Sequence, residues 1–326
     1  MIISASRRTD IPSYYSQWFY NRIKEGYVLV RNPVNLHQVG RIALSPDVVD
    51  GIVFWTKNPV PMMDRLGKLK KYNYYFQFTL TSYGREIEPN LPSKNAVLIP
   101  AFGRLSGQIG KERVLWRYDP IFLSSTYTIE YHIKYFRILA AKLAPYTERC
   151  ILSFLDMYRN IKTSMKNLGI RPPTEKEQDR LMEEFSKIAG NCGLILSTCA
   201  EEGDFSRYGV SHACCIDKSL FERIGEYKLD VKKDPNQREA CGCISSIDIG
   251  AYNTCKNGCI YCYANHNKKT MTDHFKCYDP SSSLLLDSLN PDDVIRERKM
   301  VSLANGQRSL FDLSFFKKNI DEIQGK

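Results

Sequence analysis

The sequence predicts an α/β protein, a partial TIM-like (β/α) barrel in which parallel strands alternate with helices. Apolar runs of strand length recur along the chain, and segments with the apolar spacing of helices separate them, as in sheets that are buried on both faces. Polar residues follow these runs, as at the rim where such barrels carry their chemistry. A chain of 326 residues with 43% hydrophobic content can bury a core of this size as one main domain.

The first expected strand covers residues 2–6 and ends in the polar run 7–10. Further strands are expected over the remaining apolar runs, 51–55, 74–81, 113–120, 150–156, 193–199 and 246–252. Helices are expected from Pro12 to Gly26 and over 62–69, 126–143 and 174–190, the last opening with the capping box of Thr174 and Glu177. A helical stretch is also expected after Pro291-Asp-Asp.

Polar side chains at the strand ends would meet on one rim of this barrel. They are Arg7, Arg8, Asp10, Lys57, Asn58, Thr81, Arg117, Asp119, Asp156 and Glu201. Any one of them could instead form a salt bridge or a helix cap. Their coincidence on one rim indicates a functional site.

Three cysteines form the most informative motif, Cys255-Lys-Asn-Gly-Cys259-Ile-Tyr-Cys262. In a reducing compartment such a run favours a metal over disulfides. Three thiolates on a [4Fe–4S] cluster leave one iron open to a small molecule. A structural zinc site is the alternative, although zinc normally takes four protein ligands and this run offers no local fourth.

The C-x3-C-x2-C spacing, with Tyr261 before the third cysteine, resembles the signature of the radical S-adenosylmethionine (SAM) enzymes. The resemblance implies that Cys255, Cys259 and Cys262 ligate a [4Fe–4S] cluster, and that Tyr261, Tyr263 and Asn265 border SAM. It further implies reductive cleavage of SAM to a 5′-deoxyadenosyl radical that abstracts hydrogen, with electrons from a reductant such as flavodoxin or ferredoxin.

In that family the cysteine loop follows the first barrel strand, whereas here it lies beyond residue 250. The order is that of a barrel cut after its first unit and rejoined, which is a circular permutation. Residues 2–6 are therefore expected to pair in parallel with residues 246–251, since the termini of domains are often close together.

The chain also resembles a family known only as a domain of unknown function, whose members carry such a cysteine cluster near the C-terminus. The resemblance rests on residues 4–12, 54–59, 117–120 and 241–250 and supplies no established reaction. Within these segments and their neighbours, the candidate catalytic residues, for contacts with the SAM carboxylate or a substrate, are Arg7, Arg8, Asp10, Lys57, Arg117 and Asp119.

Further cysteines crowd the region 192–262 and converge on the same rim. The preferred set for a second site is Cys199, Cys215, Cys241 and Cys243, which could hold a second Fe–S cluster, zinc or no metal. Adjacent cysteines are hard to use on one metal, so Cys214 is expected to be a spectator. Cys150 is expected in the core and Cys277 at the surface.

Residues 1–270 are expected to form the barrel, and residues 271–326 a C-terminal extension. No run of eighteen apolar residues and no signal peptide occur, which predicts a soluble, cytoplasmic protein without a membrane partner. The net charge of +10 admits nucleic acid as a partner, or is an ordinary aid to solubility. Gln307-x-x-Leu310-Phe311 resembles the peptide by which DNA enzymes bind the sliding clamp, the alternative being a helix that docks on the barrel.

The sequence thus favours a radical SAM enzyme of unknown substrate, with DNA among the candidates. The alternative is a non-catalytic Fe–S electron carrier or a metal-stabilised nucleic-acid-binding protein. A full rim of polar side chains is more than an electron carrier needs, which favours the enzyme.

Overall fold

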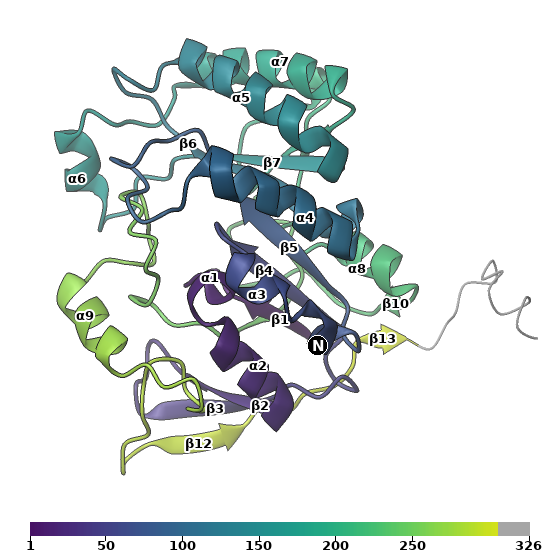
Figure 1. Ribbon diagram of the computed structural model, residues 1–326, viewed down its shortest axis with the longest axis vertical. Coiled ribbons are helices and arrows are strands. Elements are labelled where there is room, and N and C mark those ends of the chain that lie inside the picture. The colour runs from purple at the N-terminus through teal and green to yellow at the C-terminus, as the bar shows by residue number, and fades with distance from the viewer. Residues whose placement is uncertain (306–326) are drawn as a thin grey trace, which may run out of the picture.

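An eight-stranded, fully parallel sheet forms the centre of the computed structural model, which describes residues 1–305 (Figure 1). Its strands lie in the order β11 (Ile247–Asp248), β1 (Ile2–Ala5), β4 (Gly51–Thr56), β5 (Tyr74–Thr79), β6 (Val114–Ile121), β7 (Arg149–Phe154), β8 (Ile195–Thr198) and β9 (Ser211–His212). The α/β class predicted from the sequence, with its parallel sheet, is confirmed.

Helices follow most of the strands, and α4, α5 and α7 lie side by side over one face of the sheet (Figure 1). The α-helices in the described part of the chain are α1 (Ile11–Tyr14), α2 (Ser16–Glu25), α3 (Val60–Met63), α4 (Ile99–Ile109), α5 (Ile129–Leu143), α6 (Lys162–Asn167), α7 (Glu175–Asn191), α8 (Lys218–Gly225) and α9 (Lys268–Lys276). The predicted capping box is present at α7, where Thr174 and Glu177 satisfy each other's backbone amides.

The two faces of the sheet carry different cores, because successive side chains of a strand point to opposite faces. Ile52 and Phe54 of β4 belong to the core beneath the long helices. Val53 between them belongs to a second core, formed with Phe221 of α8 and the cysteine-rich segment. At Gly51 a Cβ atom would lie 2.1 Å from the Phe221 ring, so this close approach of α8 requires glycine.

His132 of α5 is fully buried and has both ring nitrogens occupied. Its Nδ1 lies 2.9 Å from the Tyr118 hydroxyl, and its Nε2 lies 2.8 Å from the carbonyl oxygen of Phe122, to which it donates. Burial lowers the pKa of His132 from 6.5 to about 4. The imidazole is therefore neutral at physiological pH.

The His132 pKa predicts a loss of stability in weak acid. The unfolded chain takes up this proton near pH 6.5 and the folded protein only near pH 4, so stability falls as the pH drops between these values. The free energy of unfolding should be about 2 kcal/mol lower at pH 5 than at pH 7 on account of this residue. Urea unfolding of wild type and His132→Gln at both pH values measures it, with the exposed His266→Gln as control. Equal pH dependence of all three proteins would contradict the prediction.

A second, smaller sheet lies beside the main one and was not predicted. It consists of β12 (Val294–Glu297), β3 (Gln38–Ala43) and β2 (Tyr27–Arg31), with β12 parallel and β2 antiparallel to β3. The helix expected after Pro291 is therefore wrong, and residues 294–297 form a strand. Val294 and Ile295 are β-branched residues, which favour strands. They hydrogen-bond along the open edge of β3, a contact that the local sequence does not reveal.

Three further expectations differ in detail. The helix predicted from Pro12 to Gly26 is divided at Tyr15 into α1 and α2. The one predicted over 62–69 is the short α3 followed by a 3₁₀ turn, Leu66–Leu69. The strand predicted over 246–252 is only two residues long, because the Asp248 carboxylate accepts hydrogen bonds from the backbone amides of Arg7 and Gly250 at 2.8 and 3.0 Å, in place of a longer ladder.

Strands β1 and β11 pair in parallel, with Ile3 opposite Ile247 and Ser4 opposite Asp248. This confirms the pairing predicted between residues 2–6 and 246–251. The C-terminal part of the described chain adds β12 to the small sheet and pairs β13 (Ala304–Asn305) with β10 (Lys228–Leu229). The motif at Gln307, Leu310 and Phe311 lies outside the described residues. None of the described helices is long and apolar enough to span a membrane.

Candidate metal and cofactor site

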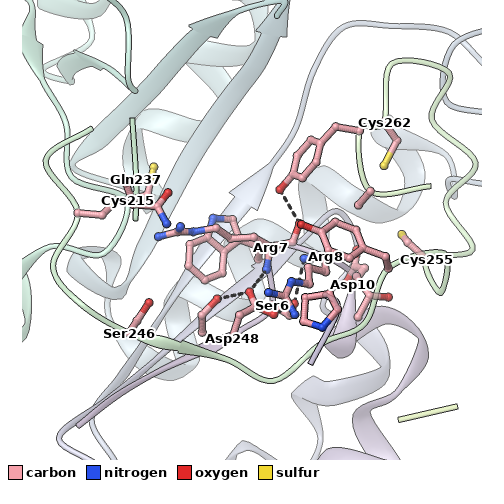
Figure 2. Close-up of a pocket in the computed structure, with 18 of the residues that line it drawn as sticks. Ser6, Arg7, Arg8, Asp10, Cys215, Gln237, Ser246, Asp248, Cys255 and Cys262 are labelled. Carbon is pink, nitrogen blue, oxygen red and sulfur yellow. Dashed lines mark hydrogen bonds between the residues drawn. The ribbon is translucent and has the colours of Figure 1, made fainter. Parts of the chain in front are cut away.

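A cavity of about 1110 Å³ opens at the carboxyl ends of the parallel strands. It is lined by most of the predicted site residues, namely Arg7, Arg8, Asp10, Lys57, Arg117, Asp119, Asp156, Tyr261, Tyr263, Cys199, Cys215, Cys241, Cys243, Cys255, Cys259 and Cys262. Asn58, Thr81, Glu201 and Asn265 lie outside this lining. Figure 2 places Cys215 on one side of the cavity and Cys255 and Cys262 on the other, with Arg7 between them.

The loop that carries Cys255, Cys259 and Cys262 is held by its neighbours. Asn265 donates from Nδ2 to the carbonyl oxygen of Cys255 at 2.6 Å, which closes the loop on itself. Gly258 has a left-handed φ of +70°, and a Cβ atom there would lie 3.0 Å from Nδ2 of Asn90. The loop conformation therefore depends on glycine between the first two cysteines, a detail inside the predicted motif.

Burial raises the pKa of each thiol of this loop, that of Cys259 to about 12. All of the described cysteines are free thiols, with Cys150 buried in the core and Cys277 exposed, as predicted. A buried thiol with a raised pKa is a poor nucleophile in the absence of a metal. Binding of a metal would release the proton and give the thiolate.

Asp10 holds this loop through a hydrogen bond with Asn257. The carboxylate is buried and accepts hydrogen bonds from the backbone amides of Ser13 at 3.0 Å and Lys57 at 2.8 Å and from Nδ2 of Asn257 at 3.1 Å. It thereby caps α1 and ties the ends of β1 and β4 to the cysteine loop. Burial raises the pKa of Asp10 against these hydrogen bonds.

Lys57 points to Glu88, a residue that sequence reasoning missed. Glu88 is 2% exposed and accepts from Nζ of Lys57 at 2.8 Å, Nζ of Lys94 at 2.6 Å and Oγ1 of Thr81 at 3.0 Å. The Tyr261 hydroxyl also donates to it. Burial alone would raise the pKa of Glu88, but the two lysines lower it to about 2.

The second group of cysteines gathers on the opposite wall. The sulfurs of Cys199 and Cys215 are 2.8 Å apart, longer than the about 2.05 Å of a disulfide bond. The Ile216 amide donates to the Cys243 sulfur at 3.3 Å, and Cys241 lies in contact with Cys243. Within residues 1–305, however, no three His, Cys, Asp or Glu side chains are already arranged as a metal-ligand group.

A buried arginine accompanies these thiols. Nη1 of Arg117 donates to the Cys215 sulfur at 2.8 Å, and its Nε donates to Asp119 at 3.0 Å. Burial would lower the pKa of Arg117, but its interactions with Cys215 and Asp119 raise it. A permanent positive charge therefore lies against the thiol of Cys215.

Arg7 links the two walls. Its carbonyl oxygen accepts from the Tyr263 hydroxyl at 2.7 Å beside the cysteine loop, while its side chain extends toward Cys215 (Figure 2). The guanidinium lies 5.4 Å from the ring centre of Trp55. Its Nη2 is buried and has no hydrogen-bond partner among the described residues. A buried donor of this kind is normally satisfied, so an acceptor on a bound group would complete the site.

Two more polar atoms near this site are buried without a described partner, Oγ1 of Thr9 and Oδ1 of Asn265. Thr9 lines the cavity beside Arg7 and Arg8. Arg8, which also lines the cavity, lies 5.0 Å from the ring centre of Tyr252 and donates to the carbonyl oxygen of Gly250 at 3.4 Å. Of these two atoms, Oγ1 of Thr9 belongs to a residue that lines the cavity, where a hydroxyl can donate to or accept from a bound ligand.

The fold and the site define an α/β protein whose parallel sheet opens onto a cysteine-lined cavity. Residues 2–264 match the family described as Domain of unknown function (DUF1848), and the chain belongs to this family. The matched region includes both groups of cysteines. The predicted membership of a domain-of-unknown-function family is thus confirmed. Comparison with curated proteins gave no match, and comparison with solved structures gave none either.

Proposed function

We propose that the protein is an iron–sulfur enzyme of the radical SAM type, built on a circularly permuted partial barrel. One observation carries the proposal: the loop of Cys255, Cys259 and Cys262 opens, at the carboxyl ends of the strands, into the same cavity that Arg7 lines with its unpartnered Nη2. The pairing of β1 with β11 supports the permutation, because it puts the strand before the loop at the edge of the parallel sheet.

The residues present fit the implied groups. Cys255, Cys259 and Cys262 would hold a [4Fe–4S] cluster and leave one iron for SAM. Nη2 of Arg7, whose side chain extends to the opposite wall, is a donor suited to a substrate group bound there, while Asn265 shapes the loop through its hydrogen bond to Cys255. When bound, the cluster and SAM would supply a 5′-deoxyadenosyl radical for hydrogen abstraction. The chain itself binds and orients the reactants and excludes water from the cavity.

A second metal centre at Cys199, Cys215, Cys241 and Cys243 is part of the proposal. A metal bound by four thiolates carries net negative charge, and Arg117 lies against Cys215 where it would offset that charge. The side chain of Arg7 extends to the same wall (Figure 2). Either an iron–sulfur cluster or zinc would satisfy four cysteines.

Nucleic acid remains a candidate substrate or partner because of the net charge of +10. Association with a sliding clamp through Gln307, Leu310 and Phe311 would place the enzyme on DNA. A reductant such as flavodoxin or ferredoxin would deliver the electron.

The experiment is anaerobic loading with iron and sulfide, reduction with dithionite in the presence of SAM, and chromatography for 5′-deoxyadenosine. The enzyme is expected to form the product. A non-catalytic electron carrier would be reduced without forming it, and a zinc-stabilised nucleic-acid-binding protein would take up no cluster. Either of these results would reject the proposal.

A further inference from the structure

The segment 84–91, between β5 and α4, contacts the cysteine loop through Ile87, Glu88 and Asn90. The amide of Ile260 donates to the carbonyl oxygen of Ile87 at 3.1 Å. Nδ2 of Asn90 donates to the carbonyl oxygen of Lys256 at 2.8 Å. At the turn between these contacts, Gly258 leaves room for Asn90. The segment therefore packs against the loop and holds it by backbone and side-chain hydrogen bonds.

Glu88 is the buried charged residue of the segment 84–91. Its side chain is 1% exposed, and those of Lys57 and Lys94 are 12% and 21% exposed, so the three charges interact largely out of water. Tyr261, which donates to Glu88, lies between Cys259 and Cys262 in the sequence. The position of the carboxylate is thus coupled directly to the part of the loop that carries two of the thiols.

The charges of Glu88, Lys57 and Lys94 also lie close to the cysteine loop. Lys57 and Lys94 both donate to Glu88, and the hydroxyl of Tyr261, two residues after Cys259, donates to the same carboxylate. Two lysines and one carboxylate leave one net positive charge beside Cys259. Burial of one carboxylate with two ammonium groups is costly in a structural core, where an apolar set of the same volume would serve as well. The arrangement therefore calls for a role that depends on charge.

We propose that Glu88 is a positioning residue for the proposed cluster: it fixes Tyr261 and the cysteine loop, and with Lys57 and Lys94 it sets the charge that the cluster experiences. The inference rests on the proposed function in one respect, namely that the loop holds a redox-active cluster. Charge and hydrogen bonding near a cluster are among the factors that set its reduction potential.

The charge part of the proposal is tested by the midpoint potential of the cluster nearest the loop, measured by redox titration of the iron-loaded protein. Glu88→Gln removes a negative charge and should shift the potential upward, because the added electron is then better stabilised. Lys94→Met removes a positive charge and should shift it downward. Glu88→Asp keeps the charge and should stay closer to wild type than Glu88→Gln.

A matched control lies in the same segment. Glu86 is exposed, accepts a hydrogen bond from the Tyr127 hydroxyl and, within residues 1–305, forms none with the cysteine loop, so Glu86→Gln should leave the potential unchanged. A wild type that takes up no iron refutes the proposed function. A wild type that holds a cluster whose potential is the same in Glu88→Gln and Lys94→Met overturns the role of Glu88 and leaves the proposed function standing.

The proposal that Glu88 positions the cysteine loop is tested separately, by thiol alkylation of the metal-free protein. In the metal-free full-length protein, Glu88→Gln should make the alkylation of Cys259 by iodoacetamide several-fold faster, because the loop loses the anchor at Tyr261 and the thiol becomes more accessible. Cys150, which is fully buried, reports by its lack of reaction that the fold is intact. Equal rates at Cys259 in Glu88→Gln, Glu86→Gln and wild type would overturn the proposal even if no iron binds.

Discussion

Replacing Cys255, Cys259 and Cys262 together by alanine is expected to remove one iron–sulfur cluster and to abolish any SAM-dependent chemistry. The proposed cluster has no other thiol ligands, and the loss of all three leaves nothing to hold it. The fold should persist, because the loop is also held by Asp10, Asn90 and Tyr261, none of which is changed. Iron and sulfide per chain, with the visible absorption spectrum, measure the effect.

The control is Cys277→Ala, which removes an exposed thiol just after α9 and should leave the iron content at the wild-type level. Any second cluster should survive in the triple variant. An iron content that does not change in the triple variant would refute the assignment of the cysteine loop.

The second large effect is expected on the opposite wall of the cavity. Replacing Cys241 and Cys243 together by alanine should remove the metal of the second centre and leave the cluster of the loop in place. It should also lower stability, because metal binding energy contributes to folding and two guanidinium groups would then face the cavity without the negative charge of the centre. Metal analysis of the variant distinguishes iron from zinc.

Cys214→Ala is the matched control, because Cys214 is the adjacent thiol outside the preferred set. Its sulfur lies close to Gly242, where a Cβ atom would come within 2.7 Å of it. This variant should retain the metal. Metal content that is identical in wild type and the Cys241/Cys243 variant would mean that these thiols form an ordinary core.

The parallel sheet could be predicted because each of its main strands is a short apolar run that can be recognised in the local sequence. Residues 51–56 and 149–154 are almost wholly buried, and runs that are apolar on both faces occur in few other settings. The small sheet could not be predicted in the same way. Its strand β12 is exposed at every position and exists because β3 offers an open edge, a contact between residues far apart in the sequence.

The candidate site could be predicted in outline because it lies at the ends of these predictable strands. The ends of parallel strands meet at one edge, so polar residues there converge whatever their separation in the chain. Glu88 escaped notice because it lies between β5 and α4, in a segment with no periodic pattern. Only the folded structure brings it against Lys57 and Tyr261. A buried carboxylate between two lysines cannot be recognised from the sequence around it, because the lysines approach it only in the folded protein.

Formation of 5′-deoxyadenosine by the reduced, iron-loaded protein is the measurement that tests the central claim most directly. The wild type is predicted to convert SAM to this product, and the variant lacking Cys255, Cys259 and Cys262 is predicted to form none. The electron paramagnetic resonance spectrum of the reduced wild type should also change when SAM is added. A cluster that is fully assembled and reduced, yet gives no product and no spectral response to SAM, would contradict the account.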